Sequence, residues 1–442
     1  MQFSSNNEDF HAWLCHKTII HIKTQLCLNI SQNFKNYENR EIFEIMKFAH
    51  LADCHLGSWR QEELQRLNFQ SFQKVIERCI QERVEFILIS GDLFDSAYPP
   101  IEILKDSFAE FKKVHDAGIP VYLIAGSHDF SASGKTFLDV LEKAGFCKNV
   151  EDWEAEEDGR IKLKPHLHKD IAIYGYPGRK SGMEIEDLRK VYLSEMHPFT
   201  IFMIHTTIKD VIGTIPMDSI EKQKLPLANY YAMGHIHQPF EARESNSYYV
   251  YPGPTFPNNF QELADLNYGS FQLFEIQNGI SRTQSIKIPL KEIAYVEIEI
   301  EDGLTATQKI IAEFDKLNLR DKIVLLKLKG TLKQGKTGDI HFNEIEDFVK
   351  KKEVYSFLKN ISSIKIPESD FSTDSFPTEN VENIERRILG EYSQKNPGDF
   401  TKHLPQLMTA LSIEKNEDER SVIFEDRLLS ELKNILKLSE II

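Results

Sequence analysis

Five short stretches of the sequence carry side chains that could hold metal ions or move protons. They read ADCHLG, SGDLFD, AGSHD, MIHTT and MGHIHQP, and their candidate side chains are Asp53, His55, Asp92, Ser127, His128, His205, His235 and His237. Carboxylate and imidazole groups suit divalent transition ions such as Mn²⁺. Together the stretches predict a metal centre built from acidic and histidine side chains.

Each stretch follows an apolar segment that is typical of a β-strand. Asp53 and His55 are two residues apart, as are His235 and His237, so both members of a pair would lie on one face of an extended segment. In open α/β sheets, sites form where the carboxyl ends of strands meet. We therefore expect five strand ends to converge, with Cys54 turned toward the core.

The expected chemistry is displacement at phosphorus, assisted by two metal ions. Two ions held about 3.5–4 Å apart by a shared carboxylate form a clamp for such a reaction. Asp92 is the predicted shared ligand, because it stands midway in the order and directly follows Gly91, which permits a tight turn. A single histidine at a strand end is more often structural than a ligand. All five stretches in this order indicate two Mn²⁺ ions, with Mg²⁺ as the alternative.

The rest of the chain supplies the elements that must position these residues. Alternating strand and helix patterns predict a layered α/β domain over residues 46–285 and a small α/β domain over 286–366. Residues 367–442 begin as a linker rich in Ser, Pro and acidic residues and continue as short helices. One apolar stripe there consists of Phe424, Leu428, Leu432 and Ile435. An isolated helix cannot bury such a stripe, so it packs on its own domain or docks on a partner.

Residues 1–45 differ from the domain that follows them. They lack the pattern of a signal peptide, and Cys15, His16, His21 and Cys27 match no standard zinc spacing. Our hypothesis is that Met46 is the biological start, or that residues 1–45 are a loosely attached, disordered extension.

Composition narrows the class of protein. The hydrophobic fraction of 41% and the charged fraction of 27% are typical of soluble globular proteins, and no apolar run is long enough for a membrane span. With a net charge of −15, the protein is not of the class that binds nucleic acid through positive charge over its whole surface. Bound metal ions can still reverse the sign locally. The five cysteines form no C-x-x-C pair and indicate reduced thiols of a cytoplasmic protein.

The pattern over residues 46–258 resembles the calcineurin-like metallophosphoesterases, which implies a sandwich of mixed β-sheets flanked by helices. More narrowly, HLADCHLG, SGDLFD with Pro99 and Pro100, YAMGHIHQP and YPGPT resemble the nuclease subunit of DNA double-strand-break repair complexes, the SbcD and archaeal meiotic-recombination nuclease family. The resemblance implies a 3'-5' exonuclease and single-strand or hairpin endonuclease, nucleoid-associated in the cytoplasm. It also implies that residues 286–366 cap the site, that the helical tail binds an SMC-like coiled-coil ATPase, and that the protein is a homodimer.

The resemblance also assigns roles to individual residues. It implies one metal ion on Asp53, His55, Asp92 and His237, and another on Asp92, Ser127, His205 and His235. His128 would contact the scissile phosphate and act as general acid, and Asp129 would orient it. The candidate DNA contacts are Arg60, Lys135, Arg179 and Lys180, although for any single one of them a solvated surface charge is the favoured interpretation.

Two positions depart from the family pattern. Ser127 stands where the family has asparagine, so we expect looser binding of the second metal ion rather than an inactive site. Asp95 stands where some members have a histidine that helps exonuclease action, and it is predicted to lie just outside the metal ligands. Two rival functions stay open: a phosphoesterase with another substrate, and a DNA-tethering scaffold with weakened catalysis.

Overall fold

The computed structural model describes residues 45–131, 136–179, 182, 184–195, 197–213, 218–277, 280–365, 403–411 and 421–436. Two compact units are present, one ending at Ile366 and one beginning at Pro367. The predicted extension before residue 45 and most of the predicted linker lie outside the described residues, as do Lys135 and Lys180. Among the helices described, none has both the length and the apolar character needed to cross a membrane.

The first sheet carries the earliest ligand stretches. Its strands, in spatial order, are β15 (Ile280–Ile288), β14 (Gly269–Gln277), β1 (Ile45–Leu51), β2 (Phe86–Ser90), β3 (Val121–Ile124) and β4 (Lys148–Asn149). The strands from β1 to β4 are parallel, and β14 pairs with β1 in the antiparallel direction. The carboxyl ends of β1, β2 and β3 therefore meet at one edge of this sheet.

The second sheet carries the later ligand stretches. Its strands, in spatial order, are β12 (Phe240–Glu244), β13 (Ser247–Tyr251), β11 (Tyr230–Gly234), β10 (Phe199–His205), β8 (Ile171–Tyr176) and β7 (His166–His168). Strands β8, β10, β11 and β13 are parallel. The two sheets share a buried core in which the Phe48 ring lies 4.9–5.0 Å from the rings of Phe86, Tyr230 and Phe274. This shared aromatic core holds the two sheets together face to face.

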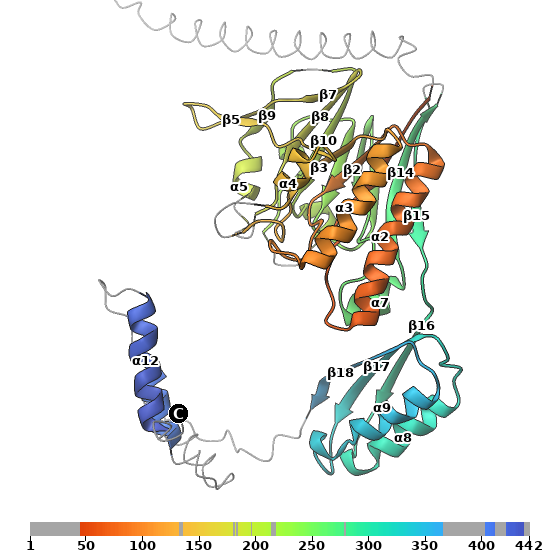
Figure 1. Cartoon of the computed structure of the whole chain (residues 1–442), viewed down its shortest axis with the longest axis vertical. Helices are drawn as coiled ribbons and strands as arrows, with labels where there is room; N and C mark the ends of the chain where they lie inside the picture. Colours follow the sequence, from red (N-terminus) through yellow and green to blue (C-terminus); the bar gives the residue numbers. More distant parts are fainter. Residues whose placement is uncertain are drawn as a thin grey trace, which may run out of the picture. The chain divides into compact units, whose positions relative to one another are not determined.

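Helices and short strands cover the outer faces of the sandwich. Figure 1 shows α2 (Glu62–Glu82) and α3 (Ile101–Asp116) lying along the first sheet, where they share a core with α4 (Leu138–Lys143). The second sheet is covered by α5 (Glu184–Leu188) and a small sheet of β5 (Trp153–Ala155), β6 (Ile161–Leu163) and β9 (Val191–Leu193). The connections include α6 (Lys209–Ile212), η1 (Lys222–Lys224) and α7 (Phe260–Leu266). These elements confirm the predicted layered α/β fold.

A small α/β module follows the sandwich. It consists of the parallel strands β16 (Ile293–Glu299), β17 (Ile323–Thr331) and β18 (Ser356–Lys365), with α8 (Gly303–Asp315), η2 (Thr337–Asp339) and α9 (Phe342–Lys351). Strand β15 stays in the first sheet up to Ile288, so residues 286–288 belong to the sandwich and the small module begins near Ile293. Tyr355 and Ser356 donate hydrogen bonds to Glu63 on α2.

The second unit contains α11 (Leu404–Leu411) and α12 (Ser421–Ile435), which contact each other. The stripe residues Phe424, Leu428, Leu432 and Ile435 are partly buried on α12, while Leu429 is exposed. The stripe therefore keeps some exposed apolar surface within this unit.

Candidate metal centre

The predicted ligands come together at the carboxyl ends of five strands. Asp53 and His55 follow β1, Asp92 follows β2, and Ser127 follows β3. His205 is the last residue of β10, while His235 and His237 follow β11. Among the described residues, three groups of side chains there could each hold a metal ion: Asp53 with His55 and His237, Asp53 with Asp92 and His205, and His55 with Asp95 and His128.

The backbone around the centre is held in an unusual conformation. Asp53, His55, Asp92 and His235 have φ values of 51°, 42°, 49° and 94°, a region that non-glycine residues seldom adopt. Backbone hydrogen bonds between the first two loops stabilise it, with His55 donating to the carbonyl of Asp92 at 3.0 Å. The loops therefore pin the ligands through backbone geometry as well as through side-chain contacts.

The first group points two imidazole nitrogens at each other. His55 Nε2 lies 3.3 Å from His237 Nε2, and the latter lies 3.9 Å from Asp53 Oδ1. His55 Nδ1 faces Asp95 Oδ1 at 3.2 Å, and His237 Nδ1 faces Glu262 Oε1 at 2.9 Å. Because a carboxylate only accepts, both Nδ1 atoms carry the proton, and both Nε2 lone pairs face the centre. This donor set fits a divalent cation.

The second group is fully buried. His205 Nδ1 donates to the carbonyl of Ser90 at 3.0 Å, which directs Nε2 toward Asp92 Oδ2 at 3.2 Å. Within the described part of the chain, this buried Nε2 has no hydrogen bond of good geometry. Such an unsatisfied atom beside two carboxylates again fits a bound cation.

Electrostatics in the second group follow from burial and charge. Burial opposes the charged form of His205, but Asp92 and Asp53 outweigh it and raise the pKa of His205 to about 10. Burial likewise opposes ionisation of Asp92, yet His205 and His55 hold the pKa of that carboxyl well below its usual range. Without metal, the imidazolium of His205 therefore offsets part of the carboxylate charge that a cation would neutralise.

Ser127 and His235 lie beside these groups. Ser127 Oγ is 3.5 Å from Asp92 Oδ2, and its side chain is partly exposed. The His235 ring centroid is 5.2 Å from that of His205, and the His235 backbone donates to Asp53 Oδ1 at 3.0 Å. Both side chains are therefore placed next to the buried second group, on its more accessible side.

His128 lies at the exposed face of the centre. Its Nδ1 is 2.9 Å from the carbonyl oxygen of Asp95, and its ring meets the His55 ring edge-on at 4.7 Å. The His128 backbone also donates to Asp92 Oδ1 at 2.8 Å. The third group shares His55 with the first, and one neutral imidazole offers a single lone pair, so the two groups cannot both use His55. The third group therefore competes with the first for His55.

Asp129 makes contacts that differ from the expected one. Its buried carboxylate accepts hydrogen bonds from the backbones of Leu93, Phe94 and Gly126 rather than from the His128 ring. Asp129 thus ties the loop after β2 to the loop after β3. The carbonyl of Asp95 is what meets His128 Nδ1.

Two features of the centre escaped sequence reasoning. Glu262 contacts His237 although it lies on α7, in no local motif with it. Gly126 allows a close approach, since a Cβ atom there would lie 2.2 Å from Asp92 Oδ1. The glycine could have been noticed within AGSHD, whereas no spacing signal points to Glu262.

Arg60 and Arg179, the two candidate DNA contacts that the structure describes, differ in their surroundings. Arg60 is exposed on the loop that leaves His55. Arg179 is partly buried, with its guanidinium 3.5 Å from Asp187 Oδ2 and 3.4 Å from the Tyr176 hydroxyl. Arg179 is therefore engaged within the protein, which leaves Arg60 as the more available charge of the two.

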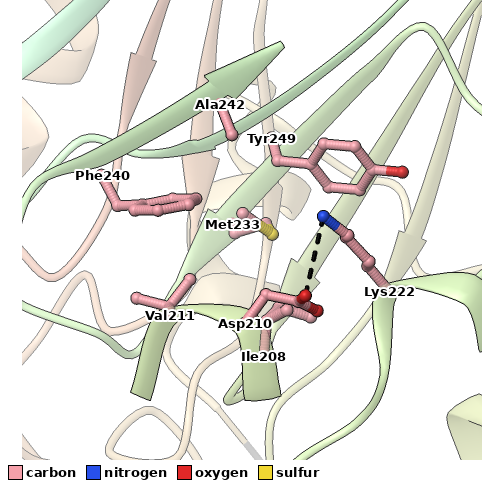
Figure 2. Close-up of a pocket in the computed structure, with 8 residues that line it drawn as sticks. All are labelled: Ile208, Asp210, Val211, Lys222, Met233, Phe240, Ala242 and Tyr249. Atoms are coloured by element: carbon pink, nitrogen blue, oxygen red, sulfur yellow. Dashed lines mark ion pairs between the residues drawn. The ribbon is translucent and has the colours of Figure 1, made fainter. Parts of the chain in front are cut away.

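A small pocket lies on the outer face of the second sheet, and none of the candidate ligands lines it. It is lined by Ile208, Asp210, Val211, Lys222, Met233, Phe240, Ala242 and Tyr249. Figure 2 shows Lys222 reaching toward Asp210, and their charged groups are 3.6 Å apart. With one internal ion pair and otherwise apolar walls, the pocket lacks the ligand set of the centre.

Residues 46–239 match the family model described as calcineurin-like phosphoesterase. The sandwich and the five converging loops agree with this match, so residues 46–239 are similar to the metallophosphoesterases of that superfamily. Within the superfamily the chain is similar to Mre11 proteins, which confirms the resemblance drawn from its motifs.

Three relatives illustrate the similarity. The DNA double-strand break repair protein Mre11 of Methanocaldococcus jannaschii is 27% identical, over 58% of this chain and 70% of that protein. The Mre11 protein of Sulfolobus acidocaldarius is 23% identical, over 85% of this chain and 97% of that protein. The uncharacterized metallophosphoesterase YhaO of Bacillus subtilis is 26% identical, over 64% of this chain and 71% of that protein.

Proposed function

We propose that the protein is a Mn²⁺-dependent DNA nuclease that processes broken ends, with Mg²⁺ as an alternative ion. One observation carries the proposal: four strand ends bring acidic and histidine side chains into two adjoining groups that share Asp53, with Asp92 between them. Similarity to repair proteins over most of the chain supports DNA as the substrate.

We assign one metal ion to Asp53, His55, Asp92 and His237, and the other to Asp92, Ser127, His205 and His235. Bound metal would supply an activated hydroxide and stabilise the charge that develops on the phosphate. The protein fixes the Nε2 atoms of its ligands by holding Nδ1 of His55, His205 and His237 from behind. The residues thus contribute a prearranged set of lone pairs.

His128 is proposed as the general acid. Its Nδ1 is held by the Asp95 carbonyl, which leaves Nε2 to carry the proton that passes to the leaving oxygen as the phosphorus–oxygen bond breaks. Its exposure allows contact with a phosphodiester that arrives from solvent.

The remaining assignments concern partners. We propose that the small module caps the site, that the partly exposed stripe on α12 binds an SMC-like ATPase, and that the protein acts as a homodimer. Exposed Arg60 is the candidate phosphate contact among the described residues.

A phosphoesterase with a smaller substrate is the rival function, because YhaO, a metallophosphoesterase, is also similar to this chain. The test is cleavage of end-labelled duplex and hairpin DNA in Mn²⁺, Mg²⁺ or EDTA, with bis(p-nitrophenyl) phosphate in parallel. We expect Mn²⁺-dependent DNA cleavage that EDTA abolishes. Hydrolysis of the small diester with no cleavage of DNA would favour the rival. Neither activity, with no Mn²⁺ bound, would favour a scaffold.

A further inference from the structure

The segment that follows the second sheet reaches back to the metal centre through one carboxylate. Glu262, on α7, accepts a hydrogen bond from His237 Nδ1 at 2.9 Å. Both side chains are mostly buried, with exposures of 19% and 23%. Residue 262 lies beyond the stretch that matches the phosphoesterase family, residues 46–239. We propose that Glu262 is a positioning residue that fixes the ring of His237 for metal binding.

The carboxylate of Glu262 is itself held in place. Its Oε2 accepts from the backbone of Asn258 at 2.9 Å, and its Oε1 also receives the side-chain amide of Asn259. Asn259 in turn caps α7, accepting from the backbone of Glu262 at 2.9 Å. Such reciprocal capping restricts the rotamer of the acid. Glu262 therefore presents a fixed acceptor rather than a mobile surface charge.

The same segment is tied to the other side of the first group. Ser58 donates to the Asn258 side chain at 3.2 Å, and the Trp59 indole donates to the carbonyl of Pro257 at 3.0 Å. Residues 58 and 59 continue the loop that carries His55. Residues 257–262 thus hold His237 through a direct hydrogen bond and His55 through contacts with the loop that carries it.

Packing holds the helix behind Glu262. The next residue, Leu263, is fully buried in a cluster with Leu64 and Leu67 of α2 and with Ile323 and Leu325 of β17. A buried anchor one residue from the acid limits movement of α7. The geometry is that of a carboxylate–histidine pair behind a metal ligand, in which loss of the outer partner typically weakens metal binding about 10–100-fold.

The experiment compares full-length wild type with Glu262→Ala, Glu262→Gln and Asp265→Ala. Asp265 is an exposed acid on the same helix that contacts Gln261 and not His237, so its loss is the matched control. Free Mn²⁺ is measured by electron paramagnetic resonance during titration. We expect Glu262→Ala to weaken one of two sites by about 10–100-fold, Glu262→Gln to weaken it less because its amide oxygen still accepts, and Asp265→Ala to match wild type.

A second readout uses no metal, since the inference rests on the proposed role of His237. In metal-free protein, nitrogen-15 shifts of His237 should show a proton on Nδ1 in wild type and a mixture of tautomers in Glu262→Ala. Wild type that binds fewer than two Mn²⁺ would overturn the proposed metal centre, while the tautomer would still decide the role of Glu262. Unchanged tautomer and unchanged affinity in folded Glu262→Gln and Glu262→Ala would overturn the inference.

Discussion

The two sides of the candidate metal centre differ in burial. Asp53, Asp92 and His205 are at most 2% exposed, whereas His128 and His235 are exposed. The buried side is fixed by strand ends, left-handed backbone and ion pairs. The exposed side faces the solvent from which a substrate arrives. Under the proposed function, the buried side retains metal, and His128 on the exposed side acts on the phosphodiester.

The largest effect is expected on the buried side, from Asp92→Asn. The substitution replaces the proposed shared carboxylate with a neutral amide, which has a single acceptor oxygen, and removes the charge that faces His205. We expect fewer than two bound Mn²⁺ and a loss of cleavage of about a thousandfold or more, since residues that act as a unit fail together. The number of bound Mn²⁺ ions per protein and the rate of single-turnover cleavage measure these two effects. If Asp92→Asn still binds two Mn²⁺ ions and cleaves DNA at the normal rate, the buried side is not the part of the centre that retains metal.

On the exposed side, His128→Ala should separate catalysis from metal binding. We expect both Mn²⁺ ions to remain and DNA cleavage to fall by about 10²–10⁴-fold. Hydrolysis of bis(p-nitrophenyl) phosphate should fall far less, because its leaving group needs no proton. Equal losses on both substrates would argue against an acid role and for a general disturbance of the site.

A neutral histidine, His50, lies next to the buried side and contacts Ser90, whose carbonyl holds His205. His50 is fully buried, 3.1 Å from the Tyr230 hydroxyl and 3.0 Å from Ser90 Oγ, and burial lowers its pKa to about 3. The unfolded chain therefore binds this proton near pH 6.5 while the folded protein does not, so stability is lost as pH falls from 6.5 toward 3. Between pH 7 and 5.5 the loss should be about 1 kcal/mol.

Chemical denaturation of metal-free protein at both pH values measures this loss. His50→Gln is the comparison, because it removes the titrating ring and leaves every other group in place. The difference between the stability losses of wild type and His50→Gln is the contribution of His50. If both lose the same stability over this range, the ring is not what makes the buried side sensitive to acid.

The smallest effect is expected at the boundary of the two sides, from Ser127→Asn. An amide carbonyl reaches further than the Ser127 hydroxyl, which now lies 3.5 Å from Asp92 Oδ2. We expect Mn²⁺ affinity at the second site to rise by up to about tenfold, as a gain of about 1.4 kcal/mol. Mn²⁺ titration measures it, with Ser127→Ala as control. Equal affinity in all three proteins would show that position 127 does not limit binding.

Much of this arrangement could be predicted because it follows from local patterns. Each ligand stretch follows an apolar segment, and this pattern predicted that the strand ends converge. The alternation of strand and helix patterns predicted the layered fold. Contacts made across long separations could not be predicted. Glu262 meets His237 only because α7 folds back, and Asp129 meets Leu93 and Phe94 because two loops happen to adjoin. Strand β15 extends past 285 because its partner β14 continues to pair with it.

The place of β1 inside the first sheet has a consequence for how the chain folds during synthesis. β1 needs β14 on one side, and the Phe48 ring needs Phe274 at 4.9 Å. Every candidate ligand is made before residue 269, so all of them leave the ribosome while one edge of β1 is still open. A fragment that stops at residue 239 would keep that edge unpaired and prone to aggregate. We therefore expect independent folding of the sandwich to require the chain at least through Gln277, the end of β14.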